Sequence, residues 1–326
     1  MDVLCVGSFM VDIVVPQLAA IPLPGGLIYA PQGITLNVGG HSANVSIDLA
    51  QLGQKDVYAT GCIGKDLLGE YVLKALKKAG VTPCPQILHD KSTAKNIALI
   101  VEGEDKRFIA ELAANTLLTP DHVLNLLGTN PKILFIGTVG GLQLVDEALV
   151  EILSAAHDAG AMTVVDVINP FESNWEHLTK ALGNIDLLHM NGDEANGITG
   201  SDSPLKAIRI LRNLGAKKLV ITNASGGLVA MSEESVFMMP AFTVEEVDPT
   251  GAGDALCAGL IHNLLSLKYP QKATLDEFKN ALIEGQAAGA ACVTEPGATT
   301  AVTFINVNKL ISEQGENVLK STIHYL

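Results

Sequence analysis

Short runs of β-branched residues alternate with helix-forming segments along most of this chain. The runs are apolar at every position, which is typical of strands buried on both faces by crossover helices. The alternation therefore predicts an α/β fold, a doubly wound and mostly parallel sheet covered by helices on both faces. The expected strands are 3–7, 55–64, 133–136, 162–167, 186–190 and 219–222, and the expected helices are 67–79, 145–159, 175–182 and 204–214.

Two segments interrupt the alternation. Residues 11–38 are rich in Pro and Gly with short extended pieces, and residues 93–112 predict two strands, 95–101 and 106–112, joined by a polar turn. Both segments leave the first strands of the sheet, so we expect them to form one small sheet over the carboxyl ends of the parallel strands, where open α/β sheets bind ligands. We expect a single α/β domain spanning 1–326, with this small sheet as its lid.

Composition and charge exclude several classes of partner. The 326 residues are 48% hydrophobic and carry a net charge of −14, which repels nucleic acid and anionic membrane surfaces. The N-terminus lacks the basic region of a signal peptide, so we expect a cytoplasmic protein. The five cysteines are scattered singly and the histidines show no paired spacing, which favours buried thiols over disulfides or a zinc site.

The segment Asp248-Pro-Thr-Gly-Ala-Gly-Asp254 runs directly into an uncharged helix expected over 255–267. Glycines before a helix allow the backbone N–H groups of Gly251, Ala252 and Gly253 to point at one spot, and the helix dipole favours an anion there. A phosphoryl group in transfer is the kind of anion that such a cradle stabilises. Alternatively, Asp254 is only a first-turn carboxylate favoured by the dipole.

A second glycine pair, Gly39-Gly40, precedes a helix expected over 42–52. Ser42 is a common helix-capping residue, and a turn with a cap would explain it. Two consecutive glycines followed by the polar Asn44 instead indicate a close backbone approach to a polar ligand. His41 is assigned no role.

Two further carboxylate positions lie where strands end. Asn191 and Glu194, three residues apart after a strand, can reach a hydrated Mg²⁺ or simply favour a helix N-terminus. Asp12 follows the first strand, where an isolated aspartate could also begin a turn.

These motifs, in this order, resemble those of the ribokinase-like (PfkB) family of carbohydrate and nucleoside kinases. Residues 248–254 are similar to the family's C-terminal signature, and Gly39-Gly40 with Asn44 to its N-terminal one. The resemblance covers nearly the whole chain. The other matching positions are Gly61, Gly64, Asp66, Gly69, Gly80, Asn191, Glu194, Gly297 and Ala298.

The resemblance implies ATP-dependent transfer of the γ-phosphoryl group to a hydroxyl of a sugar or sugar-derived substrate. Asp254 would be the base, and Gly251, Ala252 and Gly253 the anion hole. Such a reaction needs mainly positioning and charge stabilisation, without a covalent nucleophile. The other implied roles are substrate binding by Asp12, Gly39, Gly40 and Asn44, ATP binding by Asn191, Glu194, Thr222, Gly227 and Gly297, and Mg²⁺ binding by Glu194 through water.

The resemblance also implies that K⁺, bound at Asp248 beside the anion hole, activates the enzyme. The alternative is that Asp248 caps its own turn, as an aspartate before proline often does.

Two other functions stay open. A nucleoside kinase uses the same motifs, and a sensor of sugars or nucleotides could share the fold without catalysis, although the intact Gly251–Asp254 segment argues against it. A dinucleotide-dependent oxidoreductase is excluded because no G-x-G-x-x-G follows the first strand.

The small sheet also predicts self-association. It has too few residues to bury both its faces, and an exposed apolar sheet is an aggregation hazard. The family resemblance points to a homodimer through the lid. The apolar residues of its strands are Ile97, Leu99, Val101, Phe108, Ile109 and Leu112.

Overall fold

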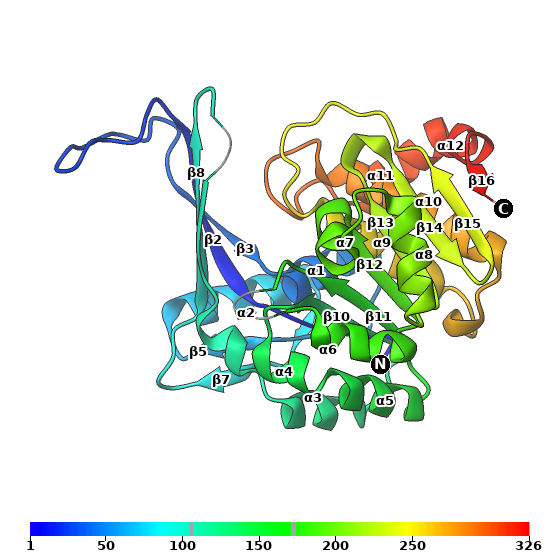
Figure 1. The fold of residues 1–326 in the computed structure, drawn as a ribbon. Coiled ribbons are helices and arrows are strands. Elements are labelled where there is room, and N and C mark those ends of the chain that lie inside the picture. The colour runs from blue at the N-terminus through cyan, green and yellow to red at the C-terminus, as the bar shows by residue number, and fades with distance from the viewer. Residues whose placement is uncertain (105–106, 171–173, 326) are drawn as a thin grey trace.

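One ten-stranded sheet forms the centre of the protein (Figure 1). The computed structural model describes residues 1–104, 107–170 and 174–325. The strand order is β16-β15-β14-β13-β12-β11-β10-β1-β4-β6, and neighbours from β13 to β6 run parallel, which confirms the expected doubly wound sheet. The strands are β1 Val3–Val6, β4 Val57–Thr60, β6 Thr82–Pro83, β10 Ile133–Val139, β11 Met162–Val167, β12 Leu187–Asn191, β13 Lys218–Thr222, β14 Leu228–Ser232, β15 Ser235–Met239 and β16 Ile323–Tyr325.

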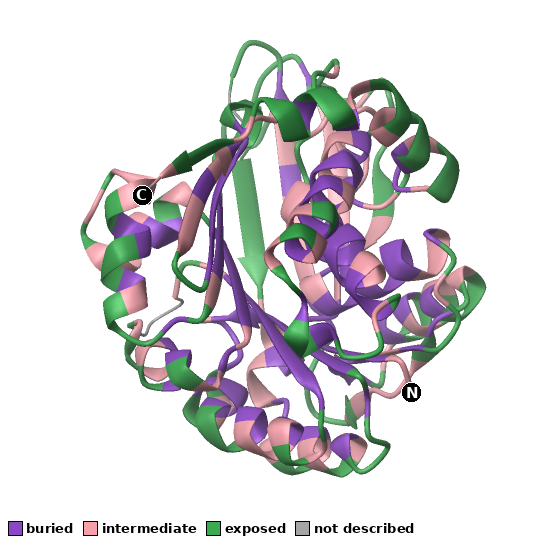
Figure 2. Cartoon of the chain, turned by 90° about the vertical axis from the view of Figure 1, so that its right-hand side faces the viewer, coloured by how far each residue is buried: buried purple, intermediate pink, exposed green. Residues whose placement is uncertain are grey.

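Helices cover both faces of this sheet. In β1, Val3 and Cys5 pack with α1, α2, α9 and α10, whereas Leu4 and Val6 pack with α3, α5, α6 and α8, because successive strand residues point to opposite faces. Figure 2 shows the burial concentrated along the sheet and the inward sides of the helices. The helices are α1 His41–Gln51, α2 Leu67–Ala79, α3 Pro120–Leu127, α4 Gln143–Glu147, α5 Leu149–Asp158, α6 Glu176–Ala181, α7 Gly192–Thr199, α8 Pro204–Asn213, α9 Ala252–Leu265, α10 Leu275–Cys292, α11 Phe304–Leu310 and α12 Glu316–Lys320. Among the helices of the described ranges, none is both long and apolar enough to cross a membrane.

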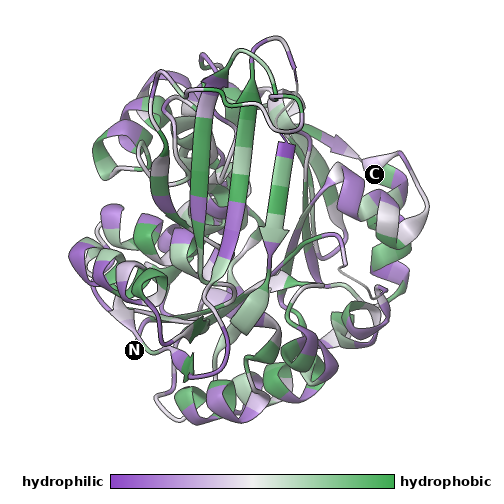
Figure 3. Cartoon of the chain, turned by 90° about the vertical axis from the view of Figure 1, so that its left-hand side faces the viewer, coloured by the Kyte–Doolittle hydropathy of each residue, from purple (hydrophilic) through white to green (hydrophobic). Residues whose placement is uncertain are grey.

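The two interrupting segments form one small sheet, as expected. Its order is β3-β2-β8-β9, and Met10 of β2 pairs in parallel with Ala94 of β8. Figure 1 shows these strands projecting away from the large sheet, and in Figure 3 they face the viewer with apolar and polar stretches along them. Lys106, the expected first residue of the last strand, lies outside the described residues. The strands are β2 Met10–Leu18, β3 Thr35–Gly39, β8 Ala94–Val101 and β9 Arg107–Glu111.

Two expectations about the large domain were wrong in detail, and one feature of its sheet was not predicted. The strand expected over 55–64 is two strands, β4 and β5 (Cys62–Gly64), and β5 pairs with β7 (Gln86–Leu88) in a separate sheet. The helix expected over 145–159 is divided into α4 and α5 around Ala148. The antiparallel edge β14–β16 was not predicted, because strand patterns alone do not show which segments extend a sheet.

Asp66 links the residue before β8 to the start of α2 by hydrogen bonds. Its Oδ1 accepts hydrogen bonds from Gly69 N at 2.8 Å and Thr93 Oγ1 at 2.7 Å, and its Oδ2 accepts one from Thr93 N at 2.8 Å. One carboxylate therefore caps α2 and fixes the point where β8 leaves toward the small sheet.

We expect Asp66→Ala to lower the free energy of unfolding by about 1–3 kcal/mol, because it removes a helix cap and leaves the Thr93 N–H without its acceptor. Urea denaturation followed by circular dichroism measures the change. The control is Lys74→Ala on the exposed side of α2. Equal free energies of unfolding for the two variants would show that the hydrogen bonds of Asp66 do not stabilise the protein.

Candidate active site

The carboxyl ends of five parallel strands meet the first turns of α1 and α9. Polar groups stand at these ends although the strands themselves are apolar and buried. This is the edge at which open α/β sheets bind ligands. The polar residues are Ser8 after β1, Thr138 in β10, Asp166 in β11, His189 and Asn191 in β12, and Thr222 in β13.

The first turn of α9 presents free backbone donors. Gly251 is the N-cap with φ 84°, and a Cβ there would lie 2.6 Å from the Cβ of Ala298, so only glycine fits. Ala252 N donates to Pro249 O at 3.3 Å, whereas the N–H groups of Gly251, Gly253 and Asp254 have no acceptor among the described residues. Such a turn at a helix N-terminus can hold an anion.

Asp254 lies beside these donors, and only one of its two carboxylate oxygens accepts a hydrogen bond. Its Oδ2 accepts a hydrogen bond from Asn44 Nδ2 at 2.8 Å, while Oδ1 is buried without a hydrogen-bond partner in the described ranges. Burial raises the pKa of this carboxyl group above its ordinary value, and the nearby His41 opposes the shift. A buried carboxylate with a raised pKa and an available oxygen can accept a proton.

The first turn of α1 brings Asn44 to Asp254. Gly40 is the N-cap with φ 94°, and a Cβ there would lie 2.3 Å from the carbonyl oxygen of Ser8. Ser42 does not cap the helix: it lies within α1, and its Oγ donates to the carbonyl oxygen of Cys5 at 2.8 Å. Asn44 Oδ1 is buried without a partner in the described ranges, which leaves it available to a ligand.

Asp12 is presented by the small sheet. Its Oδ1 accepts a hydrogen bond from Asn96 Nδ2 at 3.1 Å, and a Cβ on Gly39 would lie 2.1 Å from its Oδ2. Burial raises the pKa of Asp12, and the charge of Asp254 adds to the shift, although Asn96 opposes it. Asn96, which the sequence analysis did not single out, also has a buried Oδ1 without a partner among the described residues.

His41, given no role from sequence, lies at the centre of the site. Its Nε2 is 3.8 Å from Asp166 Oδ2 and 3.8 Å from Asp254 Oδ1, and its Nδ1 is 2.9 Å from Thr138 Oγ1. Thr138 has φ 64°, a costly backbone conformation for a β-branched residue. A strained residue thus fixes the imidazole between two carboxylates.

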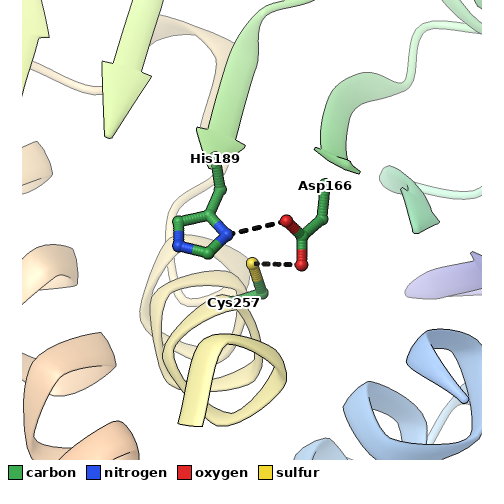
Figure 4. Close-up of side chains that lie close together, drawn as sticks. All are labelled: Asp166, His189 and Cys257. Carbon is green, nitrogen blue, oxygen red and sulfur yellow. Dashed lines mark hydrogen bonds and ion pairs between the residues drawn. The ribbon is translucent and has the colours of Figure 1, made fainter. Parts of the chain in front are cut away.

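Asp166 and His189 form a buried ion pair (Figure 4). His189 Nδ1 lies 2.8 Å from Asp166 Oδ1. Burial alone would raise the pKa of Asp166, but the charge and hydrogen bond of His189 outweigh it, so the pKa is lowered. Asp166 and His189 belong to no sequence motif, and His41, although it follows the Gly39-Gly40 pair, was given no role because its neighbours Asp166 and Asp254 come from separate elements.

Asn191 and Glu194 hold each other at the start of α7. Asn191 Oδ1 accepts from Glu194 N at 2.9 Å, and Glu194 Oε2 accepts from Asn191 N at 2.7 Å, which is a capping box. The capping box uses only Oε2 of the buried Glu194 carboxylate. Its Oε1 can therefore bind another group. A carboxylate oxygen at a strand end is a ligand that Mg²⁺ accepts, directly or through water, so the residues present fit that ion.

An apolar pocket borders the first turn of α9. Four predicted site residues line it, namely Thr222, Gly227, Ala252 and Gly253, whereas Asn191, Glu194 and Gly297 do not. The pocket is also lined by Phe242, Leu256, Gln286 and Val293.

Asp248 lies in the loop before α9. Its Oδ1 accepts from Thr250 N at 3.0 Å and its Oδ2 from Gly297 N at 3.2 Å. Asp248 therefore joins the glycine-rich turn to the loop that carries Gly297 and Ala298.

Known proteins are similar to this chain in sequence and in fold. The chain is 29% identical to Fructokinase-2 of Oryza sativa subsp. japonica over 94% of its length and 93% of the relative. It is 27% identical to aminoimidazole riboside kinase of Salmonella typhimurium, over 82% and 85%. The structure of Arabidopsis thaliana ribokinase complexed with ribose and ATP superposes with a TM-score of 0.80 at 22% identity, over 95% and 98%. Residues 1–304 match the pfkB family carbohydrate kinase domain, and the chain therefore belongs to that family.

Proposed function

We propose that this protein transfers the γ-phosphoryl group of ATP to a hydroxyl group of a sugar or sugar-derived substrate. The observation that carries the proposal is the position of Asp254: its available oxygen lies in the first turn of the helix whose N–H groups are free to hold an anion. A base and an anion cradle within one helical turn suit a reaction in which an alcohol attacks a phosphoryl group.

The proposed chemistry needs one proton acceptor. Asp254 Oδ1 takes the proton of the acceptor hydroxyl as the hydroxyl oxygen attacks the γ-phosphorus, and the bond from that phosphorus to the bridging oxygen breaks, so that ADP leaves. Negative charge that builds on the transferred phosphoryl group is stabilised by the N–H groups of Gly251 and Gly253 and by the α9 dipole. Asn44 donates a hydrogen bond to Asp254 Oδ2 and so fixes the rotamer of Asp254. The other oxygen, Oδ1, therefore stays directed at the acceptor hydroxyl.

The acceptor should carry several hydroxyl groups. Three buried oxygens of the site, Asn44 Oδ1, Asn96 Oδ1 and Asp254 Oδ1, have no hydrogen-bond partner in the described part of the chain. All three are acceptors here, so they suit a ligand that donates hydrogen bonds. Asp12 adds a carboxylate to this set. A sugar fits it, and a nucleoside with ribose hydroxyls is the second candidate, supported by the similarity to aminoimidazole riboside kinase.

The apolar pocket beside α9 suits the base of ATP, because its walls include Phe242, Leu256 and Val293 while Gly253 opens it toward the cradle. Glu194 would hold Mg²⁺, through water. When bound, that ion supplies positive charge to the phosphate oxygens.

A monovalent cation at Asp248 stays a proposal. The carboxylate already accepts two backbone N–H groups, which suits a turn cap. Asp248 and nearby backbone oxygens would hold K⁺, which would supply positive charge beside the glycine-rich turn.

Replacing the base gives the sharpest test. Asp254→Asn should lower kcat by on the order of 10²-fold or more while ATP affinity, measured by calorimetry, stays within about twofold. The raised pKa adds a pH signature. Because the base must be deprotonated, wild-type kcat/KM should fall as pH drops through a pKa above that of an ordinary aspartate, and this acid limb should be lost in the residual activity of the variant.

The matched control for this variant is Asp158→Asn at the exposed end of α5, which should behave as wild type. Near wild-type turnover of Asp254→Asn would exclude Asp254 as the base.

Asp12 should act on the acceptor alone. Asp12→Ala removes a hydrogen-bonding carboxylate and should lower kcat/KM for the acceptor by about 10–100-fold, with ATP affinity unchanged. Asp158→Ala is the control. An equal loss of ATP affinity would place Asp12 outside the acceptor site.

We also propose that the lid forms a homodimer. Phe108 and Ile109 of β9 are 56% and 61% exposed, although Val101 is buried within the lid. Neighbouring strand residues point to opposite faces, so both faces of β9 present an apolar side chain to solvent.

Analytical ultracentrifugation at micromolar concentration should give a dimer for the wild type and a monomer for Phe108→Asp. The control Ile305→Asp changes a residue that is 77% exposed on α11 and should remain dimeric. A wild-type monomer, or a Phe108→Asp dimer, would rule out association through β9.

A further inference from the structure

We propose that Asp166, His189 and Cys257 form a binding site for a thiophilic divalent cation, with Zn²⁺ as the natural occupant. Figure 4 shows the three side chains directed at one another from β11, β12 and α9. One donor atom of each lies within 4.8 Å of the others. Zinc binding at this site does not depend on phosphoryl transfer, and only its inhibitory effect rests on the proposed function.

The donor set selects the metal. An imidazole nitrogen, a carboxylate oxygen and a thiolate sulfur together suit Zn²⁺, whereas Mg²⁺ prefers oxygen ligands only. The Asp166 Oδ2 to Cys257 Sγ distance is 3.8 Å. Two ligands bound to one tetrahedral zinc ion at their usual bond lengths lie roughly 3.5 Å apart, so this pair needs little movement.

The surroundings hold the three ligands in place. They are 3%, 5% and 1% exposed in the order Asp166, His189 and Cys257. Thr222 Oγ1 lies 3.5 Å from His189 Nε2, and the backbone N–H of Val167 donates to Asp166 Oδ1 at 2.9 Å. Such outer contacts orient metal ligands and fix the histidine tautomer.

Binding displaces protons and no other group. Burial raises the pKa of the Cys257 thiol, and the nearby Asp166 carboxylate adds to the shift, so without metal the thiol is neutral. The ion binds as the thiol proton leaves to solvent. The protonated His189 of the ion pair with Asp166 also loses its Nδ1 proton to solvent as that nitrogen becomes a ligand, and it keeps the proton on Nε2, which faces Thr222. Zinc affinity should therefore fall at low pH, where protons compete.

The open side of the site faces the reaction centre. His41 Nε2 is 3.8 Å from Asp166 Oδ2 and marks this side, and water would take the fourth position on the ion. Cys257 lies three residues after Asp254 on α9, and a bound ion would fix this turn and remove the Asp166 charge from His41. The site would thus couple zinc binding to inhibition of phosphoryl transfer.

The test is direct binding to the full chain, prepared metal-free with a chelator. Isothermal titration with Zn²⁺ in excess Mg²⁺ should give one site per chain, and Co²⁺ should give the visible spectrum of a tetrahedral cobalt–thiolate centre. Cys257→Ser and Cys257→Ala should each lose affinity by more than about tenfold, since even outer contacts of metal sites cost that much. Cys84→Ser, a half-buried cysteine outside the cluster, is the control.

Unchanged zinc affinity in both Cys257 variants, with folding verified by circular dichroism, would overturn the proposal, as would the absence of a cobalt–thiolate spectrum in the wild type. These readouts need no substrate, so a failure of the kinase proposal does not affect them. Where an acceptor has been found, zinc should inhibit the wild type more strongly than Cys257→Ala.

Discussion

The hydrogen bond from Asn44 to Asp254 joins the first turns of two helices whose bonded residues are 210 positions apart in the chain. It forms because α1 and α9 pack on the same face of the sheet and begin above the carboxyl ends of the strands. The glycines before each helix allow this approach, since a side chain at Gly40 or Gly251 would collide with Ser8 or Ala298. The proposed anion cradle, base and acceptor site all depend on this meeting of two helix N-termini.

The charges at the site also limit how it can bind a ligand. Burial raises the pKa of Asp12, Glu194 and Asp254, so this small region of a chain with net charge −14 concentrates carboxylates that are costly to ionise. His41 and His189 lie among them and offset part of that cost. Backbone N–H groups supply the remaining positive potential, which explains how an acidic protein can bind an anionic nucleotide.

The fold could be predicted from sequence where local pattern decides. The predicted helix 67–79 and strand 162–167 have the same bounds as α2 and β11, because their spacing and capping residues are local signals. The glycine motifs also pointed to Gly40, Gly251 and Asp254. His41, Asp166 and His189 could not be found in this way, since they become neighbours only through the order of β10, β11 and β12 and the packing of α1 above them.

The central claim is that a hydroxylated acceptor receives the phosphoryl group at Asp254. A coupled ADP-release assay with Mg²⁺-ATP, run against fructose, ribose, sugar acids and nucleosides, tests it most directly. The account predicts ADP release that depends on one of these acceptors, together with an equal amount of phosphorylated acceptor by ³¹P NMR. ATP binding without acceptor-dependent ADP release for any of these compounds would contradict it.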